Sequence, residues 1–253
     1  MKIIAIDCSG LVASVAITED DNLIAEYNVQ YKKTHSQTLL PMLDEIKRMT
    51  ELDLKTVDAI AISKGPGSFT GLRIGSATAK GLAQALDIPI IEIGTLEGMA
   101  CNMYGTSSLV CPIMDARRSQ VYTGIFEFIK AKDGFELKTH LEDCAVSVDE
   151  IIERVSKLCR DTGKDVIFLG DGVPVFKDRI DETMSAEHSY APPHMNRQRA
   201  SAFCFLAYKY FNEGRAVSCF DHAPEYLRLS QAEREKNEGI ANKGSNYKTD
   251  GNI

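Results

Sequence analysis

The stretch KIIAID, residues 2–7, opens the chain, and a similar stretch, LVCPIMD, residues 109–115, opens its second half. Each is a short apolar run that ends in an acid, which is typical of a strand buried on both faces. Two further strands are predicted after each run, at residues 13–18 and 23–30 in the first half and at 121–129 and 135–146 in the second.

Each half then continues with a helix, a strand and a further helix. In the first half these are 36–51, 57–63 and 71–86, followed by strand 88–93 and a short helix at 95–103. In the second half they are 148–159, 166–169 and 175–184, followed by helix 199–213. The order strand, strand, strand, helix, strand, helix therefore occurs twice.

This doubled order predicts an α/β protein of the actin-like ATPase (ASKHA) fold, in which two similar βββαβα halves face each other. In that fold the acids at the ends of the two opening strands look into the cleft between the halves. We assign residues 1–106 to the N-terminal half and 107–230 to the C-terminal half, with helix 199–213 expected to pack back on the first half. Residues 231–253 have hardly any large apolar side chain and no periodicity, so we predict a disordered tail.

Composition limits the classes of function. The 253 residues are 44% hydrophobic and 26% charged, as in soluble globular proteins, and no apolar run is long enough to cross a bilayer. The seven cysteines are scattered without a CxxC pair, which favours buried thiols over metal or disulfide sites. We expect a cytoplasmic protein with no membrane contact. Its net charge of −7 argues against a main nucleic-acid-binding surface.

The segment GPGSFTGLRIG, residues 65–75, lies between a predicted strand and a predicted helix. Backbone amides around Gly65, Gly67 and Ser68, with a helix N-terminus behind them, could hold a phosphate. A tight turn whose small residues permit close packing explains the segment equally well. It is not a Walker loop, because no Gly-Lys-Ser/Thr follows. The two interpretations remain open.

The remaining candidates for phosphate binding follow the two opening strands and one later strand. Asp7 and Ser9 follow the first strand, and Asp115 and Arg117 follow the second. Arginine can bind an anion directly, but an Asp–Arg pair that fixes the hairpin is the alternative. In the later turn 170–172, Gly170 and Gly172 stand where this fold holds adenosine, and a plain turn is as good an explanation.

Six segments together resemble the bacterial TsaB family, also called YeaZ: IDCS, HSQTLLPML, ISKGPGSFTGLRIGSATAKGLA, PIMDARRSQVY, FLGDG and PEYLR. The resemblance covers nearly everything from Met1 to Arg228. It implies a role in the threonylcarbamoyl modification of adenosine 37 in tRNAs that read codons beginning with A. It also implies a non-catalytic scaffold subunit that pairs with the catalytic paralogue TsaD. The resemblance further implies that an ATPase, TsaE, joins the complex and that the subunit contacts tRNA only as part of this complex. Without its partners, the subunit is expected to form a homodimer.

The resemblance also bears on metals and cofactors. TsaD-like proteins bind metal with two histidines four apart on a helix, and the matching positions here are Thr95 and Met99. Neither replaces an imidazole, so we expect no metal, no catalytic residue and no cofactor of the chain's own. Whether a nucleotide binds in the cleft or at the complex interface stays open.

Two enzyme classes are alternatives. One is a small-molecule kinase of the same fold, similar to type III pantothenate kinases. Such kinases carry a DxGNT motif after the first strand, whereas this chain reads DCSGL at residues 7–11. A glycoprotease-like peptidase has less support, because there is no HExxH motif and no serine or cysteine has a credible partner in the sequence.

A stripe of small residues recurs every four positions along the predicted helix 71–86, and such a stripe lets another backbone approach closely. The helix beginning near residue 36 carries apolar side chains beyond a single stripe. We therefore predict a partner or dimer interface on these two helices; the alternative is that the small stripe packs against its own sheet. The predicted interface residues are Leu39, Leu40, Leu43, Gly71, Leu72, Gly75 and Ala79.

Overall fold

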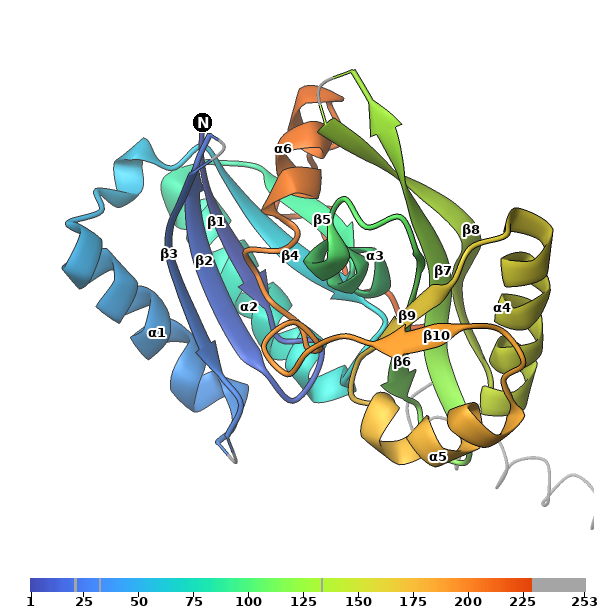
Figure 1. Cartoon of the computed structure of the whole chain (residues 1–253). Helices are drawn as coiled ribbons and strands as arrows, with labels where there is room; N and C mark the ends of the chain where they lie inside the picture. The colour runs from blue at the N-terminus through green and yellow to red at the C-terminus, as the bar shows by residue number, and fades with distance from the viewer. Residues whose placement is uncertain (21, 32, 133, 229–253) are drawn as a thin grey trace, which may run out of the picture.

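The computed structural model describes residues 1–228, apart from residues 21, 32 and 133; the predicted tail at 231–253 lies outside the described residues. Its strands form two five-stranded sheets (Figure 1), with the orders β3-β2-β1-β4-β5 and β10-β9-β6-β7-β8. The first sheet contains β1 (Lys2–Asp7), β2 (Ala13–Glu19), β3 (Asn22–Val29), β4 (Ala59–Gly65) and β5 (Ile90–Gly94). The second contains β6 (Leu109–Asp115), β7 (Gln120–Ala131), β8 (Gly134–Ser147), β9 (Val166–Leu169) and β10 (His188–Tyr190).

The helices alternate with these strands along the chain. They are α1 (His35–Thr50), α2 (Phe69–Leu86), α3 (Thr95–Ala100), α4 (Val148–Thr162), α5 (Val173–Thr183) and α6 (Cys204–Asn212), with short 3-10 turns η1 (Leu54–Thr56) and η2 (Cys101–Met103). The short strand β10 has no counterpart in the sequence analysis, because three residues are too few to establish a period.

The two sheets have the same connectivity, which confirms the actin-like ATPase fold. β1 pairs antiparallel with β2 and parallel with β4. β6 likewise pairs antiparallel with β7 and parallel with β9. The two opening strands therefore hold equivalent central places, and each ends at the predicted acid, Asp7 or Asp115.

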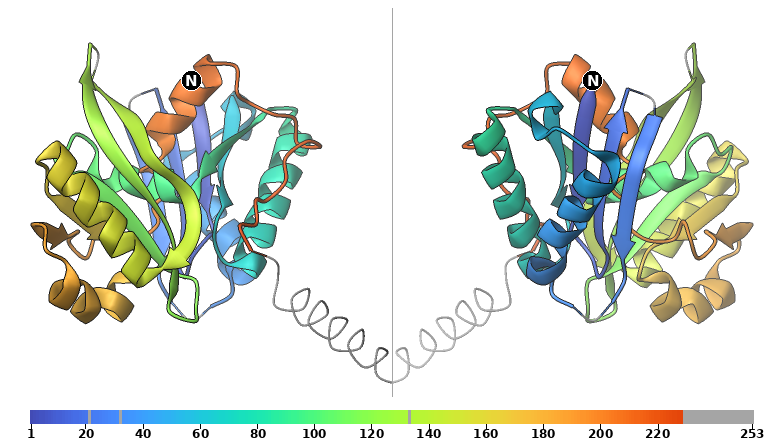
Figure 2. Two further views of the ribbon diagram at one scale, coloured as in Figure 1. Left: turned by 90° about the vertical axis from the view of Figure 1, so that its right-hand side faces the viewer. Right: turned by 90° about the vertical axis from the view of Figure 1, so that its left-hand side faces the viewer.

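Strand alternation explains why both opening strands are continuously apolar. Ile4 and Ile6 face α1 and α2 on the outer side of the first sheet, whereas Ile3 and Ala5 face the layer between the sheets. That inner layer contains α3 and α6 and receives side chains from both sheets. Helices α4 and α5 cover the outer face of the second sheet, and Figure 2 shows the outer helices from two sides. Because both faces of each sheet are covered, neither face needs polar side chains.

The chain after β10 returns to the first half. The helix predicted at 199–213 begins only at Cys204, because the residues before it form turns in which the amides of Ala202 and Cys204 donate to the carbonyls three residues earlier, at 3.2 and 3.3 Å. Side chains of β2 and β3 hold this turn segment. The amide of Ala200 donates to Ser14 Oγ at 2.7 Å, and the amide of Ser201 donates to Glu26 at 3.2 Å. Helix α6 then contacts β5. Val217 forms an antiparallel bridge with Ile90 at the edge of the first sheet.

Among the helices in the described part of the chain, none is both long enough and apolar enough to cross a membrane.

Candidate functional site

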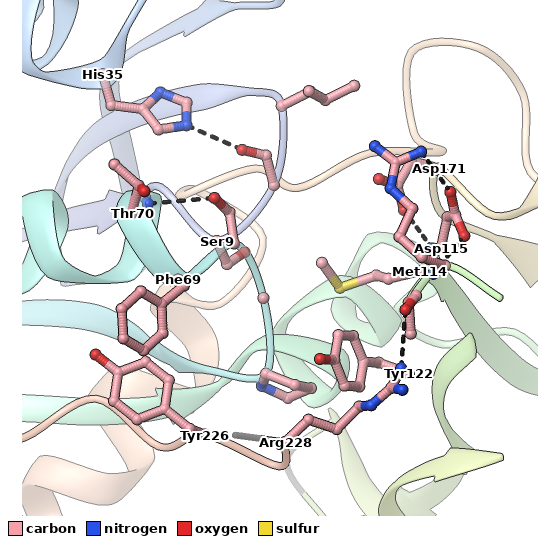
Figure 3. Close-up of a pocket in the computed structure, with 18 of the residues that line it drawn as sticks. Ser9, His35, Phe69, Thr70, Met114, Asp115, Tyr122, Asp171, Tyr226 and Arg228 are labelled. Atoms are coloured by element: carbon pink, nitrogen blue, oxygen red, sulfur yellow. Dashed lines mark hydrogen bonds and ion pairs between the residues drawn. The ribbon is translucent and has the colours of Figure 1, made fainter. Parts of the chain in front are cut away.

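A cleft of about 900 Å³ lies where the ends of β1 and β6 face each other. One wall comes from the turn after β1 and the start of α2, and the other from the turn after β6. The segment 225–228, near the end of the described chain, lines it as well, and Figure 3 shows these walls with their side chains. The cleft occupies the place where the sequence analysis puts phosphate binding.

The polar groups of the first wall form hydrogen bonds with each other and not toward the cleft. Asp7 is only 2% exposed, and its carboxylate accepts hydrogen bonds from the amide and the hydroxyl of Ser9 at 2.8 and 2.7 Å. Burial raises the pKa of the Asp7 carboxyl, although the bonds from Ser9 oppose that shift. The amide of Ser68 donates to the carbonyl of Ser9 at 2.6 Å. These amides are therefore engaged within the protein.

The glycine-rich turn is built for close packing against β1. A Cβ on Gly67 would lie 2.3 Å from the carbonyl oxygen of Ser9, and one on Gly65 would lie 2.3 Å from the carbonyl oxygen of Glu225. Side-chain atoms do not approach a backbone oxygen so closely, so only glycine fits at either position. Of the two interpretations of this turn, close packing explains the contacts that the structure contains.

The second wall is fixed by an acid–arginine pair. Asp115 accepts bonds from the amide of Arg117 at 2.8 Å and from its guanidinium at 3.2 Å. Arg117, Arg118 and Ser119 follow one another in the left-handed region, with φ between 56° and 64°. The alternative of a hairpin-fixing pair therefore describes this turn, and Arg117 already has a carboxylate partner.

The later turn lies behind the second wall. A Cβ on Gly170 would lie 2.1 Å from the carbonyl oxygen of Ile113, and the amide of Gly172 donates to that same oxygen at 3.0 Å. Only Asp171, between them, lines the cleft. Its carboxyl accepts a bond from the amide of Asp115 at 3.2 Å, and burial raises its pKa.

The structure thus divides the predicted phosphate-binding residues into two sets. Ser9, Gly67, Ser68, Asp115 and Arg117 line the cleft. The others are not among the lining residues, and they are Asp7, Gly65, Gly170 and Gly172.

Several cleft residues were not singled out from the sequence. They include Tyr122 on β7 and the segment that carries Tyr226 and Arg228. Tyr226 packs on Phe69 with ring centroids 4.7 Å apart, and Arg228 donates to the carbonyl of Ala116 at 2.8 Å. The signals in the sequence were the segments PIMDARRSQVY, which ends at Tyr122, and PEYLR, and both entered through the resemblance and not through any local pattern.

Known proteins resemble this chain over most of its length. The model of the TsaD family, described as tRNA N6-adenosine threonylcarbamoyltransferase, matches residues 23–236. The tRNA threonylcarbamoyladenosine biosynthesis protein TsaB of Bacillus subtilis (strain 168) is 34% identical over 233 residues, which cover 92% of this chain and 96% of that protein. The chain belongs to the TsaB family.

Further relatives agree with this assignment. TsaB of Escherichia coli (strain K12) is 30% identical over 237 residues, covering 92% of this chain and 96% of its own length. A solved structure of YeaZ from Pseudomonas aeruginosa superposes with a TM-score of 0.73 at 25% identity, and the match covers 89% of this chain and 99% of that chain.

In this TsaB-family chain six of the seven predicted interface residues are buried within the chain, which favours the alternative that the small stripe packs against its own sheet; the interface itself stays a prediction. Leu39 and Leu43 are 1% and 6% exposed and pack against the first sheet with α2. Gly71, Leu72, Gly75 and Ala79 are also buried within the chain. A Cβ on Gly75 would lie 3.2 Å from Ile62 Cδ1. The small stripe thus packs against its own sheet, and Leu40, 54% exposed, is the one predicted residue at the surface.

The positions that the TsaB resemblance aligns with metal-binding histidines do not fit a metal. Thr95 and Met99 are each 1% exposed and carry no imidazole or carboxylate. Met99 packs in the layer between the sheets, and its methyl group lies beside Gly170. Within the described residues, no group of three or more histidine, cysteine, aspartate or glutamate side chains could hold a metal ion.

The structure also assembles a serine, a histidine and a glutamate that the sequence analysis did not connect. His222 Nε2 lies 2.9 Å from Ser76 Oγ, and His222 Nδ1 lies 2.7 Å from Glu92 Oε1. This is the spacing of a hydrolase triad, so the statement that no serine has a credible partner is wrong.

The same three residues lack the surroundings that hydrolysis needs. Ser76 is 4% exposed inside α2, where the backbone amides serve the helix, and His222 is 1% exposed. A nucleophile needs room for a substrate and free donors for an oxyanion. The group instead ties the segment 218–228 to α2 and β5, assisted by Lys80, whose ammonium donates to the carbonyl of His222 at 2.8 Å.

Proposed function

We propose that this chain takes part in the biosynthesis of threonylcarbamoyladenosine in tRNA, as a non-catalytic subunit that pairs with a TsaD-like transferase. The observation that carries the proposal is the match to TsaB of Bacillus subtilis along 96% of that protein's length. The transferase performs the reaction at adenosine 37 of tRNAs that read codons beginning with A. A TsaE-like ATPase joins the complex, and the whole assembly works in the cytosol.

The cleft supports the non-catalytic part of the proposal. The amides of Ser9, Ser68 and Arg117 all donate within the protein, so they are not free to cradle a transferring phosphate. Thr95 and Met99 offer no metal ligands. Neither feature favours a small-molecule kinase, and the buried position of Ser76 does not favour a peptidase.

The exposed side of α1 is the surface that we propose for pairing. Leu40 is 54% exposed there. A large apolar side chain at this exposure is removed from water when a partner covers it. In the absence of the transferase, a second copy of the chain covers the same side and gives a homodimer.

The test combines capture with function. The tagged chain should co-purify the TsaD-like paralogue from its own cytosol, and cells deprived of the chain should lose threonylcarbamoyladenosine from their tRNA, measured by mass spectrometry of nucleosides. Leu40→Asp should reduce both, whereas Ile129→Asp, a change at a 42% exposed site on β7, should reduce neither. Normal modification in deprived cells would refute the proposal, and synthesis by the isolated chain would refute its non-catalytic part.

A further inference from the structure

The floor of the cleft is aromatic. Tyr226 and Phe69 lie side by side at one end, and Tyr122 projects from β7 on the opposite wall (Figure 3). Arg73 holds the first pair in place, because its guanidinium lies 3.9 Å from the centre of the Phe69 ring and its Nε donates to Tyr226 Oη at 3.1 Å. Tyr226 is still 39% exposed. A flat ligand could therefore meet a ring face without first displacing the protein's own contacts.

The charges around this floor favour an anion, although the chain as a whole carries −7. Asp115 is paired with Arg117, and Glu225 is paired with Lys64 at 3.0 Å. Asp171 accepts a hydrogen bond from the amide of Asp115 at 3.2 Å, and burial raises the pKa of its carboxyl. Arg228 donates a hydrogen bond from Nη1 to the carbonyl of Ala116, and within the described residues it has no carboxylate partner. Its positive charge is left facing the cleft.

The phosphate positions usual for this fold do not suit that anion, because amides of both turns are already engaged. Arg228 lies instead beside the aromatic floor, on the same segment as Tyr226 (Figure 3). An aromatic face beside an unpaired guanidinium is the combination that proteins use for the base and the phosphate of one nucleotide. A volume of about 900 Å³ is within the usual range for small-molecule sites.

We propose that the cleft binds one nucleoside 5′-phosphate unit, with its base stacked on Tyr122 or Tyr226 and its phosphate facing Arg228. The source of the ligand rests on the proposed function, which brings the chain next to RNA: the unit is either a free nucleotide or one nucleotide of an RNA strand. The binding chemistry is the same in both cases.

The test is calorimetric titration of the full chain with adenosine 5′-monophosphate, adenosine and inorganic phosphate. The monophosphate should bind saturably and more tightly than either of the others. At least one of Tyr122→Leu and Tyr226→Leu should weaken its binding roughly 5- to 150-fold, the range expected for loss of one stacking partner. Tyr27→Leu, at a 42% exposed tyrosine on β3 outside the cleft, should leave binding unchanged.

The phosphate contact has its own control. Arg228→Ala should bring the affinity for the monophosphate down to that for adenosine, whereas Arg118→Ala, an exposed arginine outside the cleft lining, should not. A ten-residue oligoadenylate that binds more tightly than the monophosphate, through the same residues, identifies RNA as the source; equal or weaker binding identifies the free nucleotide.

No saturable binding of the monophosphate below the millimolar range would overturn the inference. It would also be overturned if neither Tyr122→Leu nor Tyr226→Leu weakened binding more than Tyr27→Leu does. These measurements use the isolated chain without its partner. Absent nucleotide binding with normal capture of the transferase therefore refutes only this inference, whereas nucleotide binding with normal tRNA modification in deprived cells refutes only the proposed function.

Discussion

The substitution Gly71→Ala tests whether the small stripe of α2 belongs to the core or to an interface. A Cβ at Gly71 would lie 2.1 Å from the carbonyl oxygen of Cys8 and 3.2 Å from Cδ2 of His35. The oxygen is part of the backbone just after β1, next to the Asp7–Ser9 hydrogen bonds, so it cannot swing aside as a flexible side chain would. The added methyl group must displace either α2 or the end of β1.

The matched control is Gly81→Ala on the same helix, where a Cβ would meet nothing within 4 Å. Both changes replace glycine by alanine within α2, so both gain helix propensity, about 0.5–1 kcal/mol at the exposed position 81. Their difference therefore isolates the clash. Overpacking costs about 1–3 kcal/mol, and a clash with backbone belongs in the upper part of that range.

Urea unfolding followed by circular dichroism measures both variants. We expect Gly81→Ala to raise the free energy of unfolding slightly. The free energy of unfolding of Gly71→Ala should be about 2–3 kcal/mol lower than that of Gly81→Ala, which corresponds to a difference in urea midpoint on the order of 1 M. Equal stability of the two variants would refute the reasoning. If Gly71→Ala were stable yet failed to capture the transferase, the stripe would be an interface after all.

Three further outcomes follow from individual side chains. Burial, with help from Glu97 and Glu225, raises the pKa of Asp143 to about 7; the native state then holds a proton that the unfolded state releases near pH 4, so stability falls as the pH rises from 4 to 7. Asp143→Asn should therefore raise the free energy of unfolding at pH 8, by up to about 4 kcal/mol, and leave it unchanged at pH 4. An equal effect at both pH values in urea titrations would contradict this. His222→Ala should cost about 1–3 kcal/mol, because it leaves the buried hydroxyl of Ser76 and the carboxylate of Glu92 without their partner, and trypsin should then cut at Arg215 or Arg228 sooner; Ser76-dependent hydrolysis of p-nitrophenyl acetate would show that the three residues are a catalytic site instead. The isolated chain, at −7, should bind whole tRNA weakly at physiological salt; submicromolar binding in a filter assay, lost steeply as salt rises, would contradict that expectation.

The sequence by itself determined nine of the ten strands in the described residues, most helices and the doubled order of the halves. These features can be recognised in short stretches of sequence. A strand buried on both faces is a short apolar run, and a helix with one buried face repeats its apolar residues every three to four positions. The same helical spacing places Leu40 about 100° around α1 from Leu39, and Leu40 is exposed while Leu39 is buried. Each of these inferences needs only residues within about one or two turns, or one strand, of each other.

The sequence could not decide between the two interpretations of its small residues. A stripe of glycine and alanine permits a close backbone approach, but it does not say whose backbone approaches. The structure supplies the carbonyl of Cys8 at Gly71 and the side chain of Ile62 at Gly75. In the same way, the glycine-rich turn could offer its amides to a phosphate or to its own chain, and the choice appears only in the bond from Ser68 to Ser9.

Tertiary structure alone decided what the returning chain does. Before α6, Ser14 on β2 and Glu26 on β3 accept hydrogen bonds from the amides of Ala200 and Ser201. No pattern within residues 199–213 indicates these contacts. His222 meets Ser76 across 146 residues, and Arg228 meets Ala116 across 112. A periodic pattern arises when residues close together in the sequence face the same environment. Residues more than 100 positions apart come into contact only in the folded protein, so their contacts leave no such pattern in the sequence.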